Sequence, residues 1–473
     1  MTGTMNTSSW GVSTETNAGI PSAKLMQQIG TGTPMDFKIK GMCYSPCPIN
    51  GSNGDAPAMG DWFWDSFGGV GYEITGWNVL WESGGTNRGD LQAIKNLGVN
   101  TIRVYSMLSR QVALAAGYPK LVNGKEVYEY VYPAYPFDSS VQLFTHQNFL
   151  DECQSVGLSV LVGIPLPQGM FWQELYTNPA AMPQVEITFW EQVLQETVEQ
   201  VGSHPAVMGF LVQNELDDNT HLYQNTAYAQ FWWSQAEALS KIAKDAAPDK
   251  LVGMALHDNP LITLNCQTYM AACPSIDFWG VNTYQSLTFS SIFDNASSTP
   301  SGYNLLTGNA LKPVVFTEYG IPATGHTSTT DPSTIYSNNQ TTPTLGTENL
   351  TANVLANMLP QAYGAAPASP LPAYNAGLCL GLFYFEYCDE WWNQGGSPNI
   401  YTWYGGSASG GFPNGYWDQD GFGVFSVARG GTLSNSATIW TQTGGYGGPN
   451  TPVDVHTART PIANAISTAF GNV

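Results

Sequence analysis

The segment "VMGFLVQNE" (residues 207–215) is a nearly continuous apolar run that ends abruptly on Asn214 and Glu215. An apolar run of this length is typical of a strand that is buried on both faces, as in a parallel sheet. A second segment, "PVVFTEYG" (313–320), repeats the pattern and places Glu318 near its polar end. The carboxyl ends of parallel strands meet on one side of a sheet, so the two carboxylates are expected to face the same region.

Six further apolar runs alternate with helical patterns along the chain, which predicts parallel strands joined by crossover helices. Eight such units predict a closed (β/α)8 TIM barrel of the α/β class. An open doubly wound sheet is the alternative, and it is disfavoured because no glycine-rich phosphate loop follows any strand. The remaining predicted strands are 36–46, 100–106, 158–167, 251–258, 276–284 and 377–387.

The predicted helices fall between these strands. Those over 88–98 and 146–157 both end on glycine, a common signal at a helix C-terminus. Longer amphipathic patterns and a closing helix complete the set, and two weaker candidates lie at 260–272 and 302–312. The longer helices are predicted over 185–204, 226–249 and 349–366, and the closing helix over 458–470.

We expect residues 1–473 to form one barrel domain, with 1–35 as an N-terminal extension. The strand-to-helix connections after strands 1, 2, 7 and 8 are long, and such loops in a compact fold are usually functional. In a barrel they all rise from the C-terminal face, where active sites form. The last of them is expected to be a long loop or a small subdomain. These connections are 47–87, 107–145, 321–348 and 388–457.

Charge excludes some classes of partner. Only 11% of the residues are charged, and 15 basic against 36 acidic residues give a net charge of −21. Binding to nucleic acid or to an anionic membrane needs clustered Lys and Arg, so neither is expected. No apolar run reaches the length of a membrane span. Few charges limit self-repulsion in acidic surroundings, so we expect a protein that is secreted or held in the cell envelope. We also expect it to be a monomer.

Seven cysteines are present, and none has the spacing of a zinc site. Cys43 with Cys47, and Cys266 with Cys273, are close enough for local disulfides. Cys379 lies in an apolar strand-like run, where a free thiol packs well. No metal is expected.

A pair of carboxylates facing each other across a barrel mouth is what glycoside cleavage requires. One carboxylate attacks the anomeric carbon, while the other protonates the leaving oxygen and later activates water. In a retaining enzyme the two groups lie about 5–5.5 Å apart. The chemistry needs no cofactor, and none is expected.

Three segments resemble the signature segments of the clan A retaining glycoside hydrolases: "HPAVMGFLVQNE", "IDFWGVNTY" and "VVFTEYG". The resemblance extends over strands 1 to 8 and implies the roles of single residues. Glu215 would be the acid/base, and Asn214 would hold the 2-hydroxyl of the sugar in subsite −1. Glu318 would be the nucleophile.

Two more residues match this clan. Arg103 in "NTIRVYS" corresponds to the arginine near the nucleophile, where a fixed cation would keep a carboxylate ionised. Tyr284, which ends "GVNTY", corresponds to the tyrosine that hydrogen-bonds the nucleophile. The alternative for Arg103 is a structural ion pair beneath the site, and for Tyr284 it is core packing.

Within the clan, "KIKGMCYSP", "LGVNTIRVYS", "DFWGVNTY" and "FTEYG" are similar to segments of the β-1,3-glucanosyltransferases. The strand 8 segment "FEYCDEWW" also resembles that of exo-acting β-glycosidases. Many clan members have a Trp near the end of strand 8, where this chain has Phe385, Glu386 and Tyr387. Trp391 or Trp392 would then form the floor of subsite −1.

Aromatic rings suit the flat apolar faces of sugars, so tryptophans in the long loops are candidate substrate contacts. Trp172, after strand 3, is one of them, together with Trp391 and Trp392. Glu386 is a candidate partner for a sugar hydroxyl. His257 is either a substrate contact or half of a structural pair with Asp258.

The sequence therefore predicts a retaining β-glycoside hydrolase that acts on a β-glucan-type polysaccharide or oligosaccharide through a glycosyl-enzyme intermediate. The alternatives are a β-1,3-glucan transglycosylase, a β-mannan hydrolase and a non-catalytic carbohydrate-binding barrel. A metal-dependent barrel hydrolase is a weaker alternative, because it would need ligands at several strand ends and only His257 is so placed.

Overall fold

The computed structural model describes most of the chain, and the barrel strands are all within its described part. Eight parallel strands close into a barrel in which each strand pairs with its neighbours in chain order and the last pairs with the first. The described residues are 8–45, 78–84, 88–108, 119–122, 125–128, 146–166, 168–172, 184–217, 221–295, 298–323, 325–326, 335–336, 348–390, 421–428 and 455–473. The barrel strands are β4 (Ile39–Cys43), β5 (Thr101–Val104), β8 (Ser159–Gly163), β9 (Val207–Asn214), β10 (Leu251–His257), β11 (Phe278–Thr283), β12 (Val314–Tyr319) and β15 (Cys379–Tyr384).

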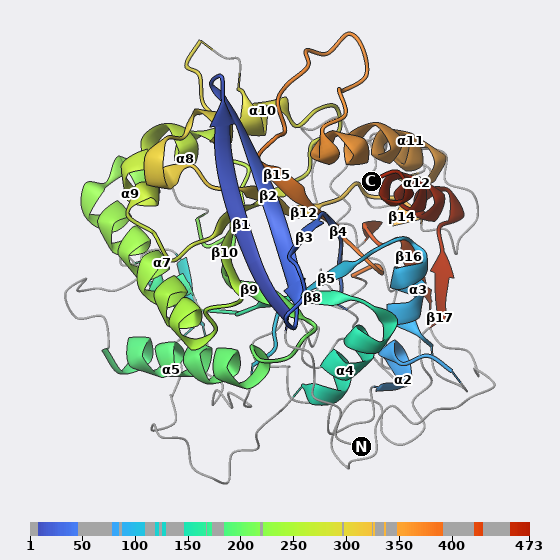
Figure 1. The fold of residues 1–473 in the computed structure, drawn as a ribbon, viewed down its shortest axis with the longest axis horizontal. Coiled ribbons are helices and arrows are strands. Elements are labelled where there is room, and N and C mark those ends of the chain that lie inside the picture. Colours follow the sequence, from blue (N-terminus) through green and yellow to red (C-terminus); the bar gives the residue numbers. More distant parts are fainter. Residues whose placement is uncertain are drawn as a thin grey trace.

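Helices surround the barrel on its outside (Figure 1). At least one of these helices follows each barrel strand in the chain, which confirms the predicted (β/α)8 architecture, and the closed barrel excludes the open sheet. The α-helices are α2 (Asn78–Trp81), α3 (Asp90–Asn96), α4 (Gln147–Val156), α5 (Gln184–Val201), α6 (His221–Gln224), α7 (Thr226–Ala246), α8 (Pro260–Asn265), α9 (Gln267–Ala271), α10 (Ser290–Phe293), α11 (Glu348–Met358) and α12 (Thr460–Gly471). Short 3-10 turns are η1 (Gln168–Met170), η4 (Tyr303–Leu305), η5 (Gly308–Ala310) and η6 (Leu359–Tyr363).

All eight predicted strands and all six main predicted helices are present, with shifted ends. The expected first strand over 36–46 is shorter, because its first residues belong to a separate strand, β3 (Met35–Phe37), outside the barrel. The weak candidates at 260–272 and 302–312 form two short helices, α8 and α9, and the 3-10 turns η4 and η5.

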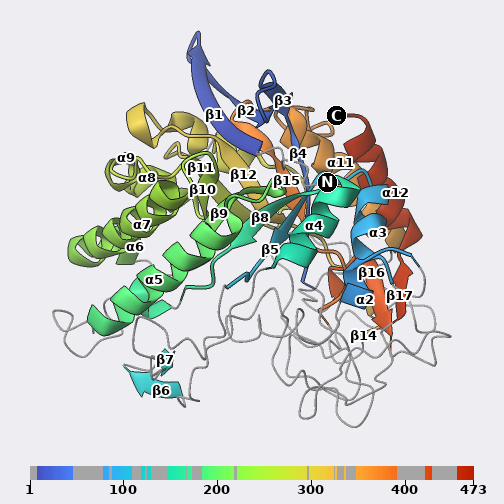
Figure 2. The same ribbon diagram turned by 60° about the horizontal axis from the view of Figure 1, so that its bottom comes forward.

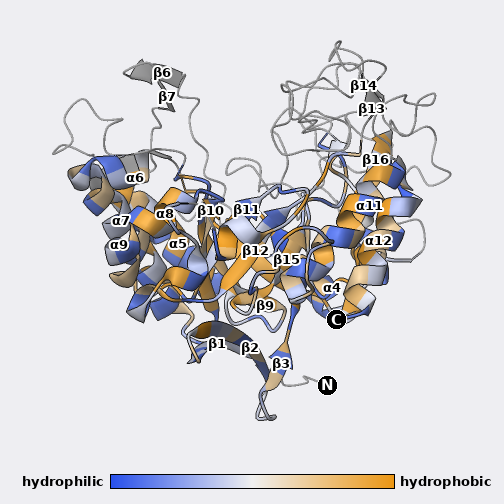
Figure 3. Cartoon of the chain, turned by 90° about the horizontal axis from the view of Figure 1, so that it is seen from above, coloured by the Kyte–Doolittle hydropathy of each residue, from blue (hydrophilic) through white to orange (hydrophobic). Residues whose placement is uncertain are grey.

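The N-terminal extension is an ordered antiparallel sheet of β1 (Ser8–Asn17), β2 (Ile20–Ile29) and β3. Figures 1 and 3 show it lying across one end of the barrel. Its hydrogen bonds go to residues just before barrel strands: Trp10 N to Asp249 O, Ala23 N to Gly377 O, and Ser8 Oγ to Pro205 O. The sheet therefore covers the N-terminal end of the barrel, opposite the expected active-site face.

Much of the long connections lies outside the described residues, including most of 47–87, 107–145, 321–348 and 388–457. Three small antiparallel pairs are described within or at the end of these connections. They are β6 (Pro119–Val122) with β7 (Lys125–Tyr128), β13 (Gly325–His326) with β14 (Ile335–Tyr336), and β16 (Phe425–Ala428) with β17 (Val455–Ala458). Figure 2 shows β16 and β17 beside α12 and α3.

A buried ion pair attaches the C-terminal segment to the eighth barrel strand. The guanidinium of Arg459 donates from Nη1 and Nη2 to the two carboxylate oxygens of Asp389, at 2.6 and 2.8 Å, and both side chains are fully buried. Arg459 also donates to Gly423 O, and its backbone N–H to Val424 O. Breaking such a pair leaves an uncompensated buried charge, so α12 is held firmly against this side of the barrel.

The expected disulfide between Cys266 and Cys273 is absent. Both are buried free thiols, and each Sγ lies within hydrogen-bonding reach of a backbone carbonyl instead, Leu222 O for Cys266 and Tyr269 O for Cys273. Cys43 is also a buried free thiol, whereas its expected partner Cys47 lies outside the described residues. Cys379 is free and buried in β15, as expected.

None of the described helices combines the length and the apolar character that crossing a membrane would require.

Candidate active site

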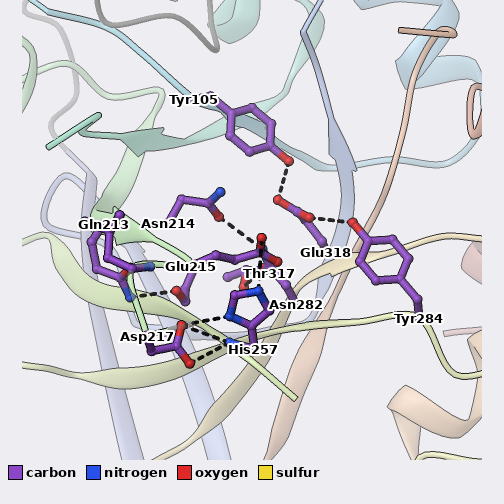
Figure 4. A network of polar contacts seen from close by, with 12 residues as sticks. Tyr105, Gln213, Asn214, Glu215, Asp217, His257, Asn282, Tyr284, Thr317 and Glu318 are labelled. Carbon is purple, nitrogen blue, oxygen red and sulfur yellow. Dashed lines mark hydrogen bonds and ion pairs between the residues drawn. The ribbon is translucent and has the colours of Figure 1, made fainter. Parts of the chain in front are cut away.

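Glu318 lies at the end of β12, where three side-chain donors surround its carboxylate. Figure 4 shows two of them, Tyr105 and Tyr284. Arg103 Nη1 donates to Oε1 at 2.9 Å, and Tyr105 OH donates to the same oxygen at 2.7 Å. Tyr284 OH donates to Oε2 at 2.5 Å. The side chain of Glu318 is only 4% exposed. A buried carboxylate with a cation and two phenols around it is fixed in one orientation, as a nucleophile has to be.

Glu215 follows the last residue of β9 and has a left-handed backbone, with φ of 52°. An L-residue adopts this conformation only when its surroundings impose it, and such positions concentrate at functional sites. The backbone N–H of Glu215 donates to Ala255 O at 2.9 Å, which holds the turn against β10. The turn is why Asn214 and Glu215, although consecutive, both contact the same network.

Each of the two carboxylates follows an irregularity in its own strand. Between Leu211 and Asn214, β9 has one residue more than the facing stretch of β10. Between Phe316 and Glu318, β12 likewise has one residue more than the facing stretch of β11. An extra residue of this kind bends the strand and changes the direction of the side chains that follow. Both glutamates therefore owe their direction to a β-bulge.

Asn282 of β11 connects the two halves of the site. Its Nδ2 donates to Glu215 Oε1 at 2.9 Å and to Asn214 Oδ1 at 3.0 Å. Its Oδ1 accepts from Thr317 Oγ1 at 2.7 Å and from Arg103 Nη1 at 3.3 Å. These partners fix which end of the amide is the donor.

Arg103 donates hydrogen bonds to residues of both strands that carry the glutamates, β9 and β12. Besides Glu318 it donates to Asn214 Oδ1 at 2.6 Å through Nη2 and to Thr317 O at 2.8 Å through Nη1. Its guanidinium also lies over the ring of Tyr105, 4.3 Å from the centroid. The structure thus brings Glu215, Glu318, Asn214, Arg103 and Tyr284 together in one network.

The pKa of Glu215 is raised from 4.5 to about 7. Burial is the main cause, because it disfavours the charged form, and the negative charge of Glu318 adds to it. His257 and the hydrogen bond from Asn282 act in the opposite direction. Glu215 is therefore protonated in mildly acidic solution and can act as a general acid there.

Aromatic packing supports the two acids. The rings of Phe385 and Phe422 make edge contacts with Tyr284, at centroid distances of 6.1 and 5.4 Å, which fixes the phenol that donates to Glu318. Trp172 is buried, at 7% exposure, and its indole N–H donates to Leu216 O at 2.5 Å. Trp172 therefore supports the backbone directly after Glu215, and a contact between this ring and a sugar stays a prediction.

His257 pairs with Asp217 rather than with Asp258. Its Nδ1 lies 3.1 Å from Asp217 Oδ1, and its backbone N–H donates to both oxygens of the same carboxylate. Asp258 instead accepts from Thr283 Oγ1 and Gln285 Nε2. The expected partner was wrong because Asp217, in the loop after β9, reaches across to the end of β10.

Three further predicted contacts follow β15 in the sequence. Glu386 is completely buried just beyond β15, where its backbone carbonyl accepts from Val424 N at 2.9 Å. Trp391 and Trp392 lie outside the described residues. Within the described part of the chain, no group of His, Cys, Asp and Glu side chains is arranged to hold a metal ion.

Four residues of the site are not among those predicted. Tyr105 and Asn282 stand two positions from Arg103 and Tyr284, so the alternation of side chains along a strand could have found them. Thr317 precedes Glu318 and becomes a partner of Asn282 only through the bulge in β12. No sequence pattern predicts Asp217 as a site residue, because it lies in a loop beyond the strand end.

A family model described as glucanosyltransferase matches residues 177–346, which is less than half of the chain. The matched segment includes Glu215, His257, Asn282 and Glu318. A search of curated protein sequences found no match.

Among solved structures, a GH2 β-galacturonidase from Eisenbergiella tayi bound to galacturonate is similar at 13% identity and a TM-score of 0.46, covering 98% of this chain and 54% of that one. A β-glucuronidase from Bacteroides uniformis is similar at 13% identity and a TM-score of 0.40, covering 87% and 39%.

A mutant of Gas2p from Saccharomyces cerevisiae, in complex with laminaritetraose and laminaripentaose, is similar at 14% identity and a TM-score of 0.43, covering 98% and 68%. The chain thus spans 54% of the length of the β-galacturonidase and 39% of the length of the β-glucuronidase. The closed barrel and the two carboxylates at the ends of its strands thus occur together with a partial match to a glucanosyltransferase model.

Proposed function

We propose that this protein is a retaining transglycosylase that acts on a β-glucan with 1,3-linkages. The observation that carries the proposal is the placement of Glu215 and Glu318 in one hydrogen-bonded network, at the ends of β9 and β12. The match to the glucanosyltransferase model supports transfer to a sugar acceptor, since it spans both carboxylates. The low content of charged residues supports action outside the cell, on a glucan of the cell envelope.

In the first step the Glu318 carboxylate attacks the anomeric carbon, and the bond to the leaving oxygen breaks. Protonated Glu215 gives its proton to that oxygen, so the shortened glucan leaves as a neutral alcohol. Arg103 and the two phenols keep Glu318 aligned for attack. The product of this step is an ester between Glu318 and the retained glycosyl group.

In the second step Glu215, now a carboxylate, removes a proton from the hydroxyl of an incoming sugar. The resulting oxygen attacks the anomeric carbon, and the bond to Glu318 breaks. Two displacements at the same carbon restore the β configuration. Asn214 is positioned beside Glu215 to bind a hydroxyl of the sugar, in the role that the clan A resemblance implies.

Azide trapping of two variants tests the roles of the two acids. With an activated aryl β-glucoside, Glu318→Ala plus azide should give the α-glycosyl azide, since one displacement inverts the configuration. Glu215→Ala plus azide should give the β-glycosyl azide, because the ester with Glu318 forms first. The measurement is NMR of the products, with the exposed Glu199→Ala of α5 as a control that retains parental activity.

Glu318→Ala with normal turnover, or the same anomer from both variants, would show that the roles are assigned wrongly. Transfer is tested by incubating the parent protein with one β-1,3-gluco-oligosaccharide of defined length. Products longer than the donor support transglycosylation, and products that are only shorter contradict it.

Hydrolysis is the second candidate, because Glu215 can remove a proton from water as readily as from a sugar hydroxyl. The same oligosaccharide experiment separates the two reactions. A parallel incubation with a β-manno-oligosaccharide tests the remaining substrate class, and a complete lack of turnover on both would favour a carbohydrate-binding barrel.

A further inference from the structure

His257 lies between the acid Glu215 and a second carboxylate, Asp217. Its Nε2 is 3.4 Å from Glu215 Oε2, while its Nδ1 is 3.1 Å from Asp217 Oδ1 (Figure 4). Asp217 is buried with its side chain at 0% exposure, whereas the imidazole is 36% exposed. One ring nitrogen thus faces the buried side chain of Asp217, and the other faces Glu215.

The hydrogen bonds around Glu215 determine which of its oxygens carries the proton. Asn282 Nδ2 donates to Oε1, and the better acceptor of such a bond in a protonated carboxyl is its carbonyl oxygen. The proton of Glu215 is therefore on Oε2, the oxygen that faces His257. Both oxygens of Asp217 accept from the backbone N–H of His257, so Nδ1 of the neutral ring donates to the same carboxylate and Nε2 presents a lone pair.

Charged and titratable groups face this pair from several elements. Glu318 on β12 and Asp217 beyond β9 disfavour a second negative charge at Glu215, and Arg103 on β5 lies behind Asn214. On its far side, Asp217 also contributes to the raised pKa of Tyr303 in η4 and of Cys266 after α8. His257, whose Nε2 lies 3.4 Å from Oε2, can change between neutral and cationic forms.

We propose that His257 is a positioning residue for the acid/base, which holds the transferable proton of Glu215 at Oε2 and is itself oriented by Asp217. When Glu215 gives its proton to the leaving oxygen, Nε2 remains beside the new carboxylate. The carboxylate then takes the proton of the acceptor hydroxyl at the same oxygen. The proposal rests on the role of Glu215 in the proposed function.

The test compares two donors that differ only in their leaving group. A dinitrophenyl β-glycoside leaves without protonation, whereas a natural oligosaccharide needs the proton from Glu215. His257→Leu should slow the first step on the oligosaccharide by about tenfold, the upper end of the effect of losing one hydrogen bond between neutral groups. Because the dinitrophenyl group leaves without a proton, the first step on that glycoside should change by less than about threefold.

The pH profile gives a second readout. His257→Leu should move the alkaline limb of kcat/KM to lower pH, because the neutral imidazole that holds the proton on Glu215 is lost. His257→Gln, which can place a polar group near Oε2, should recover part of the rate. Asp217→Asn should slow the oligosaccharide reaction as well, because the imidazole loses the partner that orients it.

Asp258→Asn is the matched control, since this carboxylate bonds Thr283 and Gln285 and makes no recorded contact with Glu215. It should leave both donors and the pH profile unchanged. Equal slowing of both donors by His257→Leu, with an unchanged profile, would overturn the proposal. Glu215→Gln acting on the oligosaccharide at the parental rate would overturn the proposed function instead, so the two failures are distinguishable.

Discussion

At the scale of single residues, the two glutamates differ only through their surroundings. The side chain of Glu318 is 4% exposed and accepts from a guanidinium and two phenols. The side chain of Glu215 is 32% exposed and accepts one amide hydrogen bond, with His257 beside its other oxygen. Environments that differ in this way separate a nucleophile from an acid.

The raised pKa of Glu215 predicts a dependence of stability on pH. Its native pKa of about 7 exceeds the ordinary value of 4.5, so the folded protein binds more protons than the unfolded chain between these values. The contribution of this group to stability is complete below pH 4.5 and is lost as the pH rises through 7. Glu215→Gln cannot titrate, so its melting temperature should rise relative to the parent between pH 5 and pH 8.

Thermal unfolding of both proteins at the two pH values measures this effect, with Glu199→Gln as a control in a surface position. A difference between Glu215→Gln and the parent that stays constant with pH would show that the pKa of Glu215 is not raised.

At the scale of elements, the barrel strands were predictable because continuous apolar runs with polar ends are rare outside buried parallel strands. Arg103 and Tyr284 were found by resemblance, and Tyr105 and Asn282 follow from the alternation of side chains on the same strands. The bulges in β9 and β12 were not predictable, because an extra residue is defined only relative to the neighbouring strand.

Close approach between strands also appears only in the structure. Gly381 in β15 has φ of 134°, and a Cβ atom at this position would lie 2.1 Å from Ile39 O in β4. Gly381→Ala should therefore lower the free energy of unfolding by at least about 2 kcal/mol, through backbone strain and overpacking.

Urea unfolding measures this loss, and Gly11→Ala in β1 is the control, because no atom lies within 4 Å of its Cβ position. Equal stabilities of the two variants would contradict the close packing of β15 against β4.

At the scale of the whole molecule, the two ends of the barrel have separate tasks. The site lies at the C-terminal ends of the strands, whereas β1, β2 and β3 cover the N-terminal ends (Figure 3). Trp10 of β1 is 6% exposed and packs edge-on against Phe37, with ring centroids 4.9 Å apart. We therefore expect this sheet to stabilise the fold rather than to take part in the reaction.

Trp10→Ala should accordingly lower the free energy of unfolding by about 3 kcal/mol, the cost of a large cavity. Below its melting temperature the variant should keep kcat/KM within about twofold of the parent, since the change lies at the opposite end of the barrel. Ile20→Ala, at 57% exposure in the same sheet, is the control and should change little in either measurement.

A selective loss of kcat/KM in Trp10→Ala, measured on fully folded protein, would show that the two ends of the barrel are coupled.

The sequence by itself determined the eight strands, the helices between them and the two acids at strand ends, because apolar patterning and strand polarity are local properties. The tertiary structure alone decided the pairing of His257 with Asp217, the bulges behind both acids and the amide of Asn282 between them. These features depend on distances between residues from different strands, and no pattern along one strand contains such distances. The raised pKa of Glu215 has the same origin, because burial and a neighbouring charge exist only after the barrel closes.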